Sequence, residues 1–227
     1  MADRISNARK KELEQPDPFL ESMYKSLDTA KKIKKQLFIG GIIILSIICI
    51  ISITVYTINS AESKASIMLT EALQNYSNNK EPIEGYSAVK GQFETLLNEY
   101  PNTSSGRIGG LRFAEICYSA GQYDMAYKLY TSALDDFKSD LVMQNIILAS
   151  LAYTCQALKK YDEAEKHFKT IVDGNTNLMK DDALFNLGMG AITNGDNKKG
   201  IDFLKKLSSG YENSMYKVMV DDIIARN

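Results

Sequence analysis

Hydrophobic and polar positions divide the chain into stretches with different patterns. Residues 37–58 carry no charged side chain. At about 1.5 Å per residue such a run spans roughly 33 Å as a helix, which matches the hydrocarbon core of a bilayer. Residues 59–227 instead place apolar side chains at the three- and four-residue spacing of amphipathic helices. The pattern predicts an all-α protein, with a single transmembrane helix at 37–58 followed by a helical domain at 59–227.

The stretch before the apolar run is polar and mixed in charge. Residues 1–16 are predicted to be disordered, and Asp17 followed by Pro18 is typical of a helix start. Apolar side chains then recur at helical spacing through residues 17–36. This helix either extends the membrane helix into the cytoplasm or lies along the inner leaflet.

Charge at the two ends of the apolar run predicts its orientation. The topology determinants are four lysines just before it: Lys31, Lys32, Lys34 and Lys35. Residues 1–36 hold nine Lys or Arg against six Asp or Glu, whereas residues 59–227 hold eighteen against twenty-two. The positive-inside rule therefore places a cytoplasmic tail at 1–36, and the domain on the periplasmic or extracytoplasmic side of the inner (cell) membrane. A cleavable signal peptide fits less well, because its apolar core is usually about 7–15 residues long.

One pattern recurs four times beyond the apolar run. It reads aromatic, small, aromatic and small or aliphatic, at spacings of three, four and three residues. Its copies are Tyr86, Val89, Phe93 and Leu96; Tyr123, Ala126, Tyr130 and Ala133; Tyr161, Ala164, Phe168 and Ile171; and a degenerate Asn197, Gly200, Leu204 and Leu207. The periods of 37, 38 and 36 residues leave room for two helices and two turns each. They predict a helical-hairpin solenoid.

The solenoid is expected to have four repeats and a cap. The predicted repeats are about 62–101, 107–138, 144–176 and 181–212. A C-terminal capping helix at 214–226 would cover the last hairpin with an apolar stripe formed by Met215, Val218, Met219, Ile223 and Ile224.

The second copy, with Gly121 just before it, resembles the tetratricopeptide repeat family. The third copy has Lys159 where that family usually has glycine. The resemblance covers roughly residues 62–212 and implies a tetratricopeptide-like solenoid that binds other proteins through a concave groove. In that family the first helix of each hairpin lines the groove.

Mapping that face onto this chain gives a largely apolar partner-binding groove. Its predicted residues are Ile108, Leu111, Tyr118, Ile146, Tyr153, Phe185, Met189 and Ile192. If they are exposed, such a surface suits extended or unfolded polypeptide with little sequence preference. Alternatively, neighbouring helices or the cap helix bury them.

The sequence offers no chemistry beyond binding. The single histidine, His167, has no nucleophile or ligand set around it, and the net charge of −1 argues against nucleic acid. Cys117 and Cys155 lie at equivalent positions of adjacent repeats, roughly 10 Å apart, so free buried thiols are expected. We expect no enzyme activity, cofactor, metal site or small-molecule substrate.

A short cytoplasmic tail, one crossing and a translocated repeat domain together resemble the YfgM-like ancillary subunit of the bacterial Sec translocon. That resemblance implies translocon subunits, exported or unfolded polypeptides and periplasmic chaperones as partners. The alternative is a dedicated scaffold for an envelope assembly, division or peptidoglycan complex.

Overall fold

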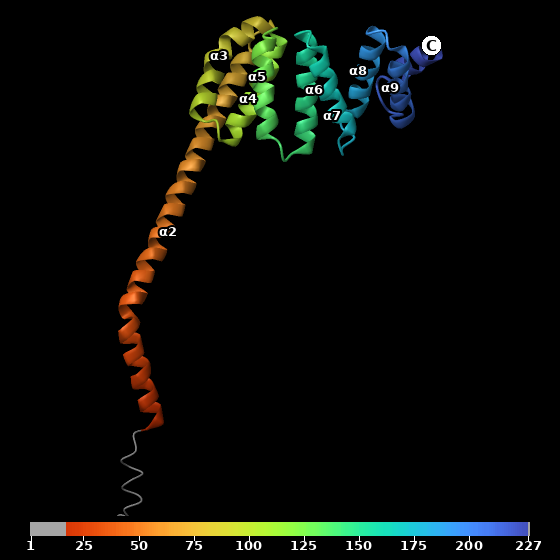
Figure 1. The fold of residues 1–227 in the computed structure, drawn as a ribbon. Helices are drawn as coiled ribbons and strands as arrows, with labels where there is room; N and C mark the ends of the chain where they lie inside the picture. Colours follow the sequence, from red (N-terminus) through yellow and green to blue (C-terminus); the bar gives the residue numbers. More distant parts are fainter. Residues whose placement is uncertain (1–16, 227) are drawn as a thin grey trace, which may run out of the picture. The chain divides into compact units, whose positions relative to one another are not determined.

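The structure, a computed structural model, describes residues 17–226 (Figure 1). The expected disorder of residues 1–16 lies outside this part of the chain. Within it the regular elements are all helices, and no strand occurs. They are α2 (Pro18–Ser77), α3 (Pro82–Glu99), α4 (Ser104–Ser119), α5 (Tyr123–Asp136), α6 (Leu141–Ala157), α7 (Tyr161–Asp173), α8 (Lys180–Thr193), α9 (Asn197–Gly210) and α10 (Lys217–Arg226). The predicted fold class is confirmed.

The chain divides into two compact units, Met1–Ile58 and Asn59–Asn227, and α2 contributes residues to both. In the first unit the carboxylate of Asp17 accepts a hydrogen bond of 2.9 Å from the backbone N–H of Phe19. This bond caps the first turn, as expected for an Asp before a Pro at the helix start. The predicted tail helix and apolar run are parts of the same helix.

The apolar part of α2 exposes its side chains all round, and Phe38–Ser77 contains a stretch long and apolar enough to cross a membrane. Its hydroxyl groups are satisfied within the helix. Ser46 donates to the carbonyl of Ile42 at 2.8 Å, and Thr54 donates to the carbonyl of Ile50 at 2.9 Å. Such internal bonds suit a helix in lipid, where water is absent.

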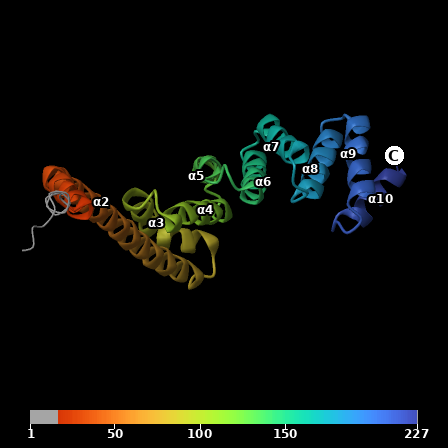
Figure 2. The same cartoon turned by 90° about the horizontal axis from the view of Figure 1, so that it is seen from below.

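The second unit is a row of antiparallel hairpins (Figures 1 and 2). Residues 59–77 of α2 pack with α3, and then α4 pairs with α5, α6 with α7 and α8 with α9, while α10 covers α9. Each later hairpin also contacts the one before it along the chain. This is the predicted helical-hairpin solenoid.

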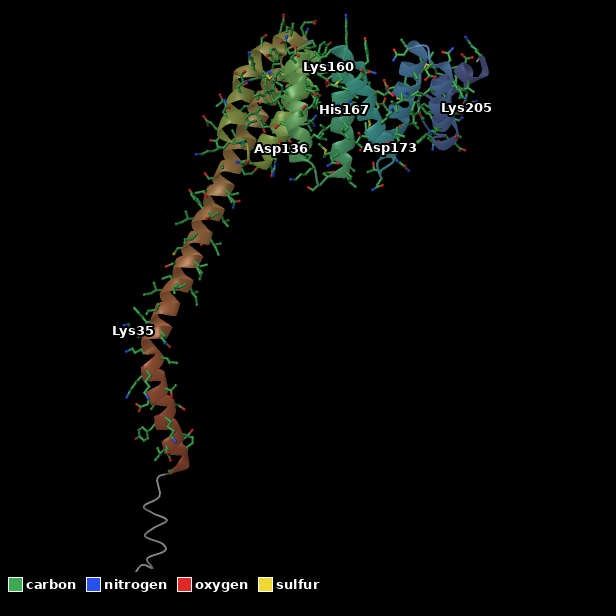
Figure 3. The ribbon with its side chains drawn as sticks, viewed as in Figure 1. Lys35, Asp136, Lys160, His167, Asp173 and Lys205 are labelled. Carbon is green, nitrogen blue, oxygen red and sulfur yellow. The ribbon has the colours of Figure 1, made fainter. Side chains whose placement is uncertain are left out.

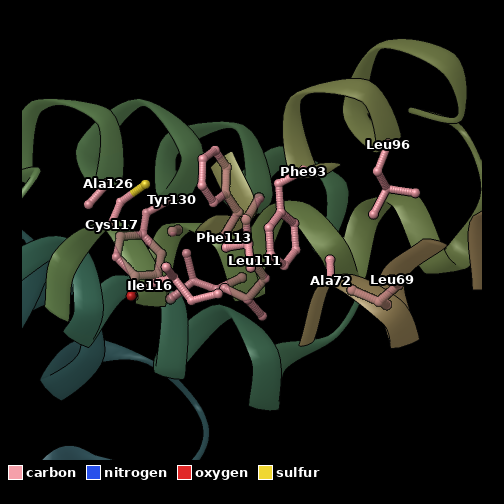
Figure 4. Packing of buried hydrophobic residues seen from close by; sticks show 14 of the residues in the cluster. Leu69, Ala72, Phe93, Leu96, Leu111, Phe113, Ile116, Cys117, Ala126 and Tyr130 are labelled. Carbon is pink, nitrogen blue, oxygen red and sulfur yellow. The ribbon is translucent and has the colours of Figure 1, made fainter. Parts of the chain in front are cut away.

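The recurring sequence pattern forms the core of each hairpin. In all four copies the second, third and fourth residues of the pattern are buried. Around the first two hairpins, Phe93 of α3 stacks on Phe113 of α4 with ring centroids 5.0 Å apart (Figure 4). In the last hairpin a Cβ on Gly200 would lie 2.7 Å from the carbonyl oxygen of Gly188, so α8 and α9 approach closely only because both residues are glycine.

The turns between the paired helices share one left-handed residue. Gly121, Lys159 and Gly195 have φ of 75°, 62° and 86°. The residue after each of them donates its backbone N–H to a carbonyl five residues earlier, as in a Schellman motif. Lys159 therefore adopts the backbone conformation that glycine adopts in the other two turns, although its side chain strains it there.

The cap packs on the solenoid with part of the predicted stripe, Ile223 and Ile224, but not with the rest of it. Val220 is fully buried against α8 and α9, with Ile224 packed beside it, whereas Met215 and Val218 are 86% and 84% exposed. The predicted stripe is therefore wrong for Met215, Val218 and Met219. The reason is that α10 begins only at Lys217, after a turn that inserts Tyr216 against α8.

Candidate partner-binding surface

The predicted groove residues lie on the first helices α4, α6 and α8, but the structure gives them unequal exposure. Ile108 is exposed, and Tyr118, Ile146, Tyr153, Phe185 and Met189 are half-buried. Tyr118 meets Tyr123 edge-on with ring centroids 5.4 Å apart, so it lies beside the turn into α5. The eight residues do not form one continuous open surface.

Leu111 cannot line an open groove, and Ile192 is partly covered. Leu111 is 6% exposed and belongs to the core shared with α3 and α6. Ile192 packs into the last hairpin, where its Cγ1 atom lies 2.5 Å from the position that a Cβ on Gly200 would take. The prediction is wrong for Leu111, because the first helices are apolar on more than one face and this side chain lies on a face that is packed in the core. Ile192 is half-buried, and its place in the groove stays a prediction.

A carboxylate and two tyrosines fix the inner face near α8. The buried carboxylate of Asp182 accepts hydrogen bonds of 2.6 Å from the hydroxyl groups of Tyr153 on α6 and Tyr216 before α10. The side-chain amide of Asn186 donates to the Tyr153 oxygen at 3.1 Å. Phe185 stacks on Tyr216 with centroids 4.3 Å apart. We call Tyr153, Asp182, Phe185, Asn186 and Tyr216 the tyrosine–aspartate cluster.

Burial and the carboxylate both hold these tyrosines in the neutral form. Burial chiefly, and then the hydrogen bond to Asp182, raise the pKa of Tyr153 far above its usual value. The same causes in the same order raise the pKa of Tyr216 to about 12. The cluster is therefore a set of fixed hydroxyl donors around one buried acceptor, and it joins α6, α8 and the segment before α10.

The sequence pointed to Tyr153 and Phe185 but not to Tyr216. No local pattern marks Tyr216 as a groove residue, because it comes 34 positions after its partner Asp182 and outside the repeats. The covering of Phe185 by this residue matches the alternative in which the C-terminal segment fills part of the groove.

An open hollow of about 370 Å³ lies between α6, α7 and α8. Its walls are partly apolar and partly polar, and include Gln156, Tyr161, Phe168, Asn186, Met189 and Thr193. We call it the α6–α8 hollow. Of the eight predicted groove residues, Met189 is the one that lines it. The hollow has room for one or two side chains of a bound polypeptide.

A carboxylate that is paired with two lysines lies beside the hollow. Glu165 of α7 accepts hydrogen bonds of 2.8 Å from Lys169 and from Lys199 of α9. The bond from Lys169, followed by the one from Lys199, lowers the pKa of Glu165 below its usual value. This carboxylate is therefore already paired, and it ties the third hairpin to the fourth.

Of the histidine and the two cysteines of the solenoid, His167 and Cys155 have Glu163 as a shared neighbour: the thiol of Cys155 donates a weak hydrogen bond to it at 3.9 Å. His167 lies on α7 (Figure 3), and its burial lowers its pKa although the charge of Glu163 partly opposes this. Cys117 and Cys155 are buried free thiols, and burial raises their pKa to about 12 and about 11. Within residues 17–226 no three His, Cys, Asp or Glu side chains form a group that could hold a metal ion.

Comparison with known proteins agrees with the hairpin geometry. Residues 148–169 match the family model of the tetratricopeptide repeat. The matched segment runs from the middle of α6, through the turn at Lys159, into α7. It includes Tyr161 and Phe168, which line the α6–α8 hollow. A tetratricopeptide repeat is a module for binding other proteins, and this is the function that the match indicates. A search of curated proteins found no match.

Proposed function

We propose that the protein is a non-catalytic, membrane-anchored repeat protein that binds a polypeptide segment in the α6–α8 hollow. The observation that carries this proposal is the position of the hollow within the hairpin that matches the tetratricopeptide repeat. Backbone and side chains of a partner would meet the side-chain amide of Gln156 and the hydroxyl of Thr193, and an apolar side chain would contact Met189 and the exposed ring of Tyr161. Apolar walls with a few polar groups are the usual composition of a recognition pocket.

The proposed anchor is the apolar part of α2, with the N terminus in the cytoplasm. Its support is the exposure of these side chains and the lysines Lys31, Lys32, Lys34 and Lys35 before them. The solenoid would then lie on the outer face of the inner membrane. There it would act on proteins that have crossed, or are crossing, the membrane.

The finer proposal is that the protein assists the secretion or folding of exported proteins beside the Sec translocon. The arrangement of tail, anchor and repeat domain supports it. So does Met189 in the wall of the hollow, because a flexible thioether adapts to different side chains. The expected partners are translocon subunits, exported or unfolded polypeptides and periplasmic chaperones.

One observation favours the alternative, a dedicated scaffold for an envelope assembly, division or peptidoglycan complex. The tyrosine–aspartate cluster is fixed by hydrogen bonds of 2.6 Å rather than free to repack. Promiscuous binders generally use flexible surfaces, whereas a rigid surface suits one partner. The two roles differ in the number of partners, which can be counted.

Co-purification from membranes tests the proposal. Met189→Glu and Thr193→Glu place a carboxylate at the hollow, and both should lose the bound proteins while the helical content stays unchanged. Ser132→Glu adds the same charge at an exposed position of α5 and should keep them. Normal capture by both hollow variants would contradict binding at this site.

The same preparation separates the two roles. A photo-reactive residue at Ile44, which is 61% exposed in the apolar run, reports what lies beside the membrane helix. Translocon subunits at Ile44, together with many exported proteins lost on Met189→Glu, would support the secretion role. One stoichiometric envelope protein would support the dedicated scaffold instead.

A further inference from the structure

Exposed apolar side chains gather on one edge of the solenoid. This edge consists of the connections α3–α4, α5–α6, α7–α8 and α9–α10 with the helix ends beside them, and these connections lie on the same side of the hairpin row (Figure 1). We call it the entry edge. Its large exposed hydrophobic residues are Leu141, Val142, Leu178, Met215 and Val218. The smallest exposed fraction among them is 40%, at Leu178, and the largest is 86%, at Met215.

The opposite edge differs in character. It consists of the turns between paired helices, with Gly121, Lys159 and Gly195 at their left-handed positions. The large exposed hydrophobic residues close to these turns are Ile83 and Tyr161. Apolar exposure is therefore concentrated at the entry edge rather than spread over both ends of the hairpins.

The chain joins the solenoid at the entry edge. Glu62 comes four residues after Ile58, the last residue of the predicted membrane helix, or about 6 Å along a helix. Its carboxylate accepts bonds from the backbone N–H groups of Ser104 at 2.7 Å and Ser105 at 3.0 Å, at the first turn of α4. The hydroxyl of Ser105 donates to it as well, at 2.6 Å. These bonds hold Glu62, which belongs to the solenoid unit, at this edge.

We propose that the entry edge rests on the bilayer, with Leu141, Val142, Leu178, Met215 and Val218 inserted at the boundary between headgroups and acyl chains. This inference rests on the proposed membrane anchor. The occupant is lipid because Glu62, which is bound at this edge, follows the proposed bilayer segment by only four residues along the chain. The apolar residues also lie on separate, successive connections. This arrangement suits contact with a flat surface such as a bilayer, whereas a bound peptide would need them to line one groove.

Charge at the entry edge indicates what kind of contact this is. Residues 99–107, 135–142, 173–181 and 209–218 carry seven Asp or Glu and four Lys or Arg, a net charge of −3. Anionic lipid would not attract such an edge. The contact is therefore driven by burial of apolar side chains, and it should form on zwitterionic lipid and persist at high salt.

The chain has no tryptophan, so one introduced indole reports a single position. Full-length Leu141→Trp and Val218→Trp variants would be reconstituted into phosphatidylcholine vesicles with and without brominated acyl chains. We expect each to lose at least half of its emission to bromine. Tyr161→Trp, at the exposed opposite edge, is the matched control and should keep its emission. Ile44→Trp, inside the apolar run, monitors the anchor.

The outcomes separate this inference from the proposed function. Quenching at Ile44→Trp without quenching at Leu141→Trp and Val218→Trp would overturn the bilayer contact and leave the anchor standing. That outcome would also show that the entry edge faces water or protein rather than lipid. Equal quenching of Leu141→Trp and Tyr161→Trp would overturn it too, since the contact would not be specific to this edge. Absence of quenching at Ile44→Trp would overturn the anchor itself.

Discussion

Replacing Lys159 by glycine should stabilise the solenoid. Lys159 has φ of 62°, in the left-handed region, at the position that Gly121 and Gly195 occupy in the neighbouring hairpins. Its backbone N–H still donates to the carbonyl of Gln156 at 2.9 Å, so the turn is complete and only the backbone conformation is unfavourable. The structure thus offers the same turn with and without a side chain.

The magnitude follows from two opposing effects. For a residue with a Cβ, the left-handed conformation raises the free energy of the folded state by about 1–2 kcal/mol. Glycine offsets part of this gain, because it loses more conformational entropy on folding, which destabilises the folded state by roughly 0.5–1 kcal/mol. Lys159→Gly should therefore raise the free energy of unfolding by about 0.75 kcal/mol, the difference between the midpoints of the two ranges. For a domain of this size that corresponds to a rise in Tm of about 1–4 °C.

Thermal unfolding of the full chain in detergent, followed by circular dichroism, measures this change. Gly121→Ala is the matched reverse, because nothing lies within 4 Å of a Cβ at that position and its φ is 75°. It should lower the Tm through backbone strain alone. The reasoning would be refuted if Lys159→Gly left the Tm unchanged or lowered it while Gly121→Ala was neutral.

Further predictions concern packing and pH. Gly200→Ala should lower the Tm, because its Cβ would lie 2.7 Å from the carbonyl oxygen of Gly188. Gly190→Ala, which has open space around the new Cβ, should leave the Tm unchanged or raise it. Equal changes in Tm for the two variants would contradict the close approach of α8 and α9. Hydrogen bonds from the hydroxyl of Ser105 and from backbone N–H groups lower the pKa of Glu62 below 4.5, so its contribution to stability is present above pH 4.5 and is lost as the pH falls through the folded-state pKa. In denaturant titrations Glu62→Gln should therefore be less stable than the parent near neutral pH, with the difference vanishing in acid; a constant difference would argue against the bond. Burial and the Asp182 bond raise the pKa of Tyr216 from 10 to about 12, so its contribution is present below pH 10 and is lost as the pH rises toward 12. Tyr216→Phe should be less sensitive to alkali over that range, and an unchanged alkaline transition would count against the cluster.

The hairpin core could be predicted from the sequence because the same pattern of aromatic and small residues occurs in all four repeats. Small residues such as Ala126 and Ala164 occur where helices meet, and aromatic residues such as Tyr130 and Phe168 fill the space beside them. This repetition separates core positions from chance hydrophobic residues. A single exception, Lys159 in place of glycine, did not hide the turn.

The surface was harder to predict, because a helix that is apolar on several faces does not reveal which face is covered. Leu111 has helical spacing consistent with a groove, yet the structure buries it in the hairpin core. Tyr216 was missed because its partner Asp182 is distant in sequence. The exposed face of α10 was assigned wrongly because the residue at which α10 begins depends on the preceding turn. The spacing of hydrophobic residues does not reveal that turn.

The central claim, that the α6–α8 hollow binds polypeptide, is tested most directly by photo-crosslinking in living cells. A photo-reactive residue at Met189 lies in the wall of the hollow, and the same residue at Ser132 serves as a control on an exposed face of α5. The account predicts discrete protein adducts from Met189 that are absent from Ser132. It also predicts that Thr193→Glu abolishes them. Adducts no stronger at Met189 than at Ser132, or adducts unaffected by Thr193→Glu, would contradict it.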